Sequence, residues 1–94
     1  MIVSLMQIII EIPDVGSIKD KRRIVNSIKE RLYKRFHVSA AEVDLQDSLS
    51  FAQIGCALVS NAKNFGESVL NKALAMVEEE PVRIYDVSIY SEEF

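Results

Sequence analysis

The sequence contains a single cysteine, Cys56, and its three glycines lie far apart. One cysteine excludes an internal disulfide and any metal site built from several cysteines. The scattered glycines form neither a P-loop nor a dinucleotide-binding fingerprint, because both motifs need closely spaced glycines ahead of a helix. A reducing compartment is the expected environment for such a chain.

The chain also lacks a segment that could cross a bilayer or direct secretion. Its most apolar stretch, residues 1–12, is too short to span a membrane. This stretch has no positively charged start and no small-residue cleavage site after it, so it is not a signal peptide. Its isoleucine and valine content is typical of a buried strand. We therefore expect a cytoplasmic protein with no membrane contact.

The chain is long enough for one small domain, and 49% of its 94 residues are hydrophobic, which is enough for a core. Apolar patterns predict strands over residues 2–11, 38–45, 50–59 and 82–90, and helices over 17–36 and 62–79. This order predicts an α+β ferredoxin-like βαββαβ sandwich over residues 1–94, with a four-stranded antiparallel sheet and two helices on one face. The first and third strands are apolar on both faces, as the central strands of that sheet should be. The tail after Tyr90 is expected to be loose.

The first predicted helix holds most of the positive charge of an otherwise acidic chain. It carries eight lysines and arginines against Asp20 and Glu30, a net charge of +6, whereas the whole chain is −3 and the rest of it is therefore −9. Lys21 projects near the middle of the apolar stripe, in the first turn, where its stem is expected to snorkel past the edge of the core. The stripe predicted for this helix consists of Ile18, Val25, Ile28, Leu32 and Phe36. The stripe predicted for the second helix consists of Phe65, Val69, Ala73, Met76 and Val77.

The basic helix is the first candidate binding site. Ammonium and guanidinium groups bind phosphate, and a basic stripe of this kind favours contact with an RNA backbone. The alternative is a solvated helix face that the acidic remainder of the chain balances. The candidate anion- or nucleic-acid-binding residues are Lys19, Lys21, Arg22, Arg23, Lys29 and Lys34.

The face of the sheet away from the helices is the second candidate. The central strands place Val3, Leu5 and Ile9 there, or their neighbours of opposite parity, together with Phe51 and Val59. An exposed apolar patch of that size marks an interface, so we expect a homodimer through the sheet face or an edge strand. The alternative is that Tyr90 and Phe94 fold over the patch. Base stacking of the kind that RNA-recognition sheets use is not expected, because the two central strands carry one aromatic residue.

The remaining polar residues predict no catalytic or cofactor site. His37 is the single histidine and has no partner nucleophile or acid near it in sequence, so a surface or capping role is expected. Cys56 lies in an apolar strand and is expected to be an inert core thiol. Glu42 and Asp44 share a face of their predicted strand, and with Asp47 they could hold a magnesium ion only weakly. We expect no enzyme, no catalytic residue, no metal and no cofactor.

Three stretches of the chain form recognisable motifs: S-I-K-D-K-R-R at residues 17–23, F-x-V-S-A-A-E-V-D-x-Q-D at residues 36–47 and I-G-x-A-x-V-S-N at residues 54–61. In these stretches the chain resembles the YlxP-like family of small uncharacterised bacterial proteins. The resemblance implies a ferredoxin-like fold in a bacterial cytoplasmic protein. Members of the family are often encoded near translation-initiation and ribosome-maturation factors, which implies an RNA or ribosome context. The family has no established activity, so no catalytic residues carry over.

Two hypotheses follow. The first is a non-enzymatic binding module that associates with RNA or the ribosome through the basic first helix. The second is a homodimeric interaction or regulatory domain whose basic helix docks on an acidic protein partner.

Overall fold

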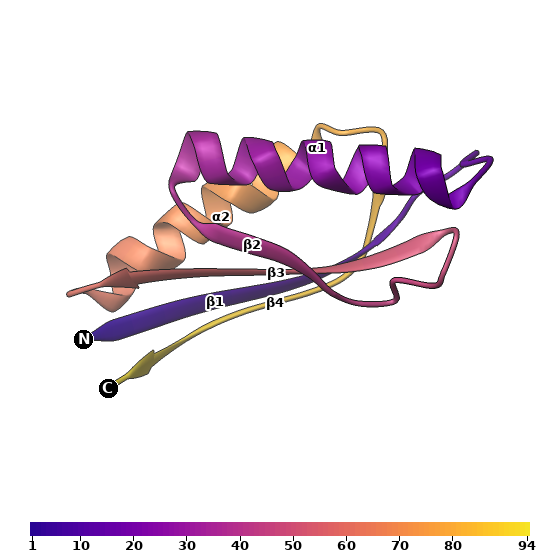
Figure 1. Ribbon diagram of the computed structural model, residues 1–94. Helices are drawn as coiled ribbons and strands as arrows, with labels where there is room; N and C mark the ends of the chain where they lie inside the picture. Colours follow the sequence, from indigo (N-terminus) through magenta and orange to yellow (C-terminus); the bar gives the residue numbers. More distant parts are fainter.

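The computed structural model describes residues 1–94 and has the predicted element order. The strands are β1 (Ile2–Glu11), β2 (Ser39–Asp44), β3 (Phe51–Ser60) and β4 (Arg83–Glu93), and the helices are α1 (Ile18–Phe36) and α2 (Lys63–Glu78). All three strand pairs are antiparallel, in the sheet order β2-β3-β1-β4. Both helices lie on the same side of the sheet (Figure 1). The ferredoxin-like α+β fold is therefore confirmed, with β1 and β3 in the centre.

The core lies between the helices and the sheet. Alternate residues of β1 and β3 point into it, including Met6, Ile8 and Ile54, because successive side chains of a strand point to opposite faces. From α1 the core receives Val25, Ile28 and Leu32.

Neither α1 nor α2 combines the length and the apolar character that a membrane-spanning helix needs.

The helix α1 begins and ends at residues suited to those positions. The Ser17 Oγ accepts a hydrogen bond from the Asp20 backbone N–H at 3.1 Å, so Ser17 is the N-cap. At the other end His37 adopts the left-handed conformation, with φ of 55°, and its N–H donates to the Tyr33 carbonyl at 3.0 Å. The prediction of a capping role for His37 is thus confirmed.

Two predictions about the C-terminal half are wrong. The tail is not loose, because β4 continues to Glu93 and the Phe94 N–H donates to the Met1 carbonyl at 2.8 Å. The side chain of Phe65 is 59% exposed instead of buried. The buried stripe of α2 begins one residue later and comprises Gly66, Leu70, Ala73, Met76 and Val77.

Gly66 allows α2 to approach β1 closely. Beneath it lies Ser4, fully buried, whose Oγ is 2.8 Å from the Ser91 Oγ. Ser91 in turn donates to the Glu67 carboxylate at 2.8 Å, so Ser4 is the donor to Ser91. A Cβ at Gly66 would lie 2.9 Å from the Ser4 Cβ, closer than side chains pack.

We expect Gly66→Ala to lower the free energy of unfolding by about 1–3 kcal/mol, because the helix must move away from β1 to admit the methyl group. Gly16→Ala is the control, since a Cβ there meets its nearest neighbour, the Asp20 carboxylate, at an ordinary 3.7 Å. Urea unfolding followed by circular dichroism measures both. Equal stability of the two variants would contradict the close packing of α2 on β1.

Candidate nucleic-acid interface

The helix α1 buries one side against the sheet and leaves the other side open. Its buried residues are Val25, Ile28 and Leu32, and with them Lys21. The other seven lysines and arginines of the helix lie at its surface, and Lys29 alone among them is partly covered. The exposed surface of α1 is therefore basic along its whole length.

Lys21 does not belong to this surface, and the prediction that it snorkels outward is wrong. Its side chain is 1% exposed. The Nζ atom donates to the carbonyls of Leu45 and Gln46 at 2.7 and 3.4 Å and also to that of Ser48. It lies 3.3 Å from the Glu42 Oε2, a buried atom that accepts no hydrogen bond, so this contact is ionic. Lys21 thus holds the β2–β3 connection in place, and its donors are not available to an external anion.

Four of the other predicted site residues, Lys19, Arg22, Arg23 and Lys34, are exposed, and Lys29 is partly exposed. Two of them pair with carboxylates of the same helix: Arg23 lies 3.7 Å from Asp20, and Lys34 lies 2.8 Å from Glu30. The hydrogen bond and the charge of Lys34 lower the pKa of Glu30 below its ordinary value. Such exposed pairs are weak, so a phosphate can replace the carboxylate.

Lys19, Arg22 and Lys29 form no salt bridge. Since no carboxylate neutralises them, their charge is directed at solvent. The two cations outside the predicted set are engaged elsewhere: Arg31 pairs with Glu80 after α2, and Arg35 lies over the Phe36 ring at 5.4 Å. The structure therefore brings together a smaller set than the sequence predicts, centred on the three unpaired cations.

The opposite layer of the molecule carries the opposite charge. Of the eleven lysines and arginines, eight lie in α1, two in α2 and only Arg83 in the sheet. The four strands together hold six carboxylates. The net charges could be counted from the sequence, but their separation into a helical layer and a sheet layer is seen only in the fold.

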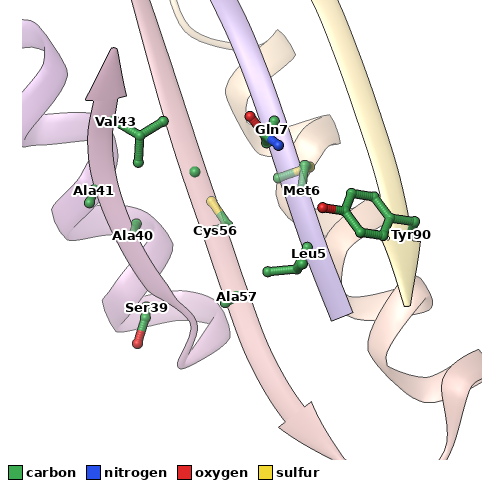
Figure 2. Close-up of a pocket in the computed structure, with 11 residues that line it drawn as sticks. Leu5, Met6, Gln7, Ser39, Ala40, Ala41, Val43, Cys56, Ala57 and Tyr90 are labelled. Atoms are coloured by element: carbon green, nitrogen blue, oxygen red, sulfur yellow. The ribbon is translucent and has the colours of Figure 1, made fainter. Parts of the chain in front are cut away.

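The open face of the sheet has the apolar character that the sequence predicts. Strand register and burial place Val3, Leu5 and Ile9 there with Phe51 and Val59. A hollow of about 450 Å³ lies on this face, between Val43 of β2 and Tyr90 of β4 (Figure 2). Tyr90 borders the hollow without closing it, and Phe94 is exposed. Tyr85 adds an aromatic contact with Phe51, at 5.5 Å between ring centres, which no local sequence pattern predicts.

The side chains considered for catalysis or metal binding lie apart. A β-bulge between Glu42 and Asp44 puts Glu42 opposite Ile54 on the helix side and Asp44 opposite Gln53 on the open face. The prediction that these two carboxylates share a face is therefore wrong. Burial raises the pKa of Cys56 to about 11, so the thiol stays protonated at neutral pH and is a poor nucleophile.

Comparison with known proteins gives one family. The family model described as "Protein of unknown function (DUF503)" matches residues 3–89. The chain belongs to this family. It is also 34% identical over 68 residues to the "Uncharacterized protein YlxP" of Bacillus subtilis, an alignment that covers 72% of this chain and 74% of that protein. The resemblance to the YlxP-like family is confirmed. Neither the description of the family nor the name of this relative states an activity.

Proposed function

We propose that this protein is an RNA-binding module whose α1 contacts the phosphate backbone. The observation that carries the proposal is the row of unpaired cations Lys19, Arg22 and Lys29 on an exposed helix, flanked by the weakly paired Arg23 and Lys34. Cations that no carboxylate neutralises gain most from a polyanion, because binding releases the counterions of the nucleic acid.

The binding that this surface supports is insensitive to base sequence. Lysine and arginine contacts to phosphate position a protein on RNA but carry no sequence information. The translation context that the YlxP-like resemblance implies makes ribosomal RNA and ribosomal subunits the first probes.

The test is a salt series of RNA binding for the wild type and for Arg22→Glu with Arg23→Glu. For about three to five phosphate contacts, we expect the logarithm of the association constant to fall with the logarithm of salt with a slope of about −2 to −4. The double variant should bind about tenfold to a hundredfold more weakly and show a shallower slope, because two contacts become repulsive. Fluorescence anisotropy of labelled ribosomal RNA fragments measures both quantities.

The matched control is Lys63→Glu with Lys72→Glu, which makes the same change of charge on α2. We expect its affinity to stay within about threefold of the wild type, since long-range charge effects are screened at physiological salt. Both double variants should melt close to the wild type because all four residues are exposed. Equal loss of affinity in the two variants, or no binding by the wild type at low salt, would overturn the proposal.

An acidic protein partner would use the same cations, so the series includes polyglutamate as a competitor. RNA that is displaced by polyglutamate at equal charge concentration would favour an acidic protein as the ligand. RNA that remains bound favours the nucleic acid, whose regularly spaced phosphates accept several charge-assisted hydrogen bonds from arginine.

A further inference from the structure

The open face of the sheet combines an apolar hollow with an acidic rim. Arg83, the single cation of the sheet, lies 3.7 Å from Glu11 and is partly neutralised by it. Strand register places Asp44, Asp86 and Glu92 on this same face, opposite Gln53, Ile9 and Val3. None of these three carboxylates forms a salt bridge. The face therefore presents uncompensated negative charge around an apolar centre.

The hollow itself is suited to one large apolar side chain. Ala57 of β3 has only a methyl group at the floor, while Val43, which packs over Gly55, and Leu5 form walls on either side (Figure 2). The Tyr90 ring borders the hollow on the β4 side without covering it, and Gln7 and Ser39 supply polar groups at the margin. Its volume of about 450 Å³ falls in the range of pockets that bind small ligands.

We propose that the open sheet face binds a basic protein segment that inserts an apolar side chain into this hollow. The lysines and arginines of the segment would face Asp44, Asp86 and Glu92, which have no cationic partner of their own. This inference is independent of the proposed RNA binding, because it concerns the other layer of the molecule.

The charge of this face argues against the other occupants. Nucleic acids and anionic lipids are repelled by a rim of three unpaired carboxylates. A second copy, the homodimer that the sequence predicts through this face, would bring the same carboxylates against one another. A basic segment gains attraction at the rim and hydrophobic burial at the centre.

The probe is a synthetic peptide of twelve residues that contains six lysines and one central phenylalanine. Its two counterparts replace the phenylalanine by serine, or all the lysines by glutamate. We expect the first peptide to bind the full chain about tenfold more tightly than the serine counterpart, since the buried ring contributes the apolar part of the affinity. The glutamate counterpart should show no binding. Backbone NMR shifts should be confined to the open face, at Leu5, Gly55 and Ala57, and absent from α1.

Different protein variants test the contribution of the acidic rim and that of the apolar hollow. Asp86→Lys with Glu92→Lys should weaken binding of the phenylalanine peptide about tenfold, because attraction becomes repulsion. The matched control is Glu78→Lys with Glu79→Lys at the end of α2, which changes the net charge equally and should bind as the wild type does. Tyr90→Ser should weaken the phenylalanine peptide about fivefold and leave the serine peptide unchanged.

Several results would overturn the inference. Equal affinity for the phenylalanine and serine peptides would show that the hollow takes no side chain. A wild-type dimer in light scattering that excludes the peptide, and that dissociates in Tyr90→Ser, would show that a second copy occupies the face. Heparin-induced shifts at Leu5, Gly55 and Ala57 would show that the face takes a polyanion instead.

Discussion

Replacing Lys21 by methionine is expected to lower the free energy of unfolding by about 3–5 kcal/mol, the cost of removing one partner of a buried ionic contact. The Glu42 carboxylate would lose its cation, and the carbonyls of Leu45, Gln46 and Ser48 would lose their shared donor. Chains of this size are stable by roughly 5–14 kcal/mol, so the loss is a large share of the total.

The connection from β2 to β3 makes Lys21 unusually costly to replace. Leu45 has a φ of 65°, a left-handed conformation that costs a residue with a side chain about 1–2 kcal/mol. Its carbonyl points at the Lys21 ammonium in that conformation, at 2.7 Å. Methionine is about as long as lysine and as apolar as the lysine stem, so it fills the same space but donates no hydrogen bond. The connection would then be free to rearrange.

Lys19→Met is the control for Lys21→Met, because Lys19 lies in the same turn and is exposed without a salt bridge. Its stability should change by less than about 0.5 kcal/mol. Combining Lys21→Met with Glu42→Leu should recover only part of the loss, since the three loop carbonyls remain without a donor. Urea unfolding measures all of these variants. A loss below about 1 kcal/mol in Lys21→Met would contradict the buried position of this side chain.

The second large effect is expected at Leu32, where replacement by alanine should cost about 2–5 kcal/mol. Leu32 is 0% exposed and lies in the core between α1 and the sheet. Removing most of its side chain loses the transfer free energy of the buried methyl groups and leaves a cavity that the close-packed neighbours fill only in part.

Tyr33→Ala provides the comparison, because the adjacent side chain is 64% exposed. It should change stability by less than about 0.5 kcal/mol, even though more atoms are removed. Thermal unfolding in a calorimeter measures the pair. Similar melting temperatures for Leu32→Ala and Tyr33→Ala would contradict the orientation of α1 about its own axis.

The fold was predictable because the apolar pattern within each element and the order of the elements along the chain indicate the same architecture. β1 and β3 are apolar on both faces, and these are the strands that the sheet encloses between neighbours. The spacing of Val25, Ile28 and Leu32 set the orientation of α1 correctly. Local periodicity and the overall order of elements therefore agree, which is why the architecture and most boundaries followed from the sequence.

The candidate site was less predictable because its details depend on contacts between distant residues. The helical periodicity placed Lys21 correctly over the core, but the carbonyls that retain it there come from residues 45–48. A bulge with no turn signal of its own separates Glu42 from Asp44. Likewise, nothing local to Phe94 indicates that its N–H reaches Met1, at the far end of the chain.

The separation of charge between the helical layer and the sheet gives the molecule an electric dipole that runs from the sheet to α1. The field of a polyanion would exert a torque on this dipole that turns α1 toward the polyanion before contact, which would raise the fraction of productive encounters. The same rotation leaves the sheet turned outward. If α1 binds RNA as we propose, each bound molecule would cover part of the phosphate-lined surface and present an acidic and partly apolar face in its place.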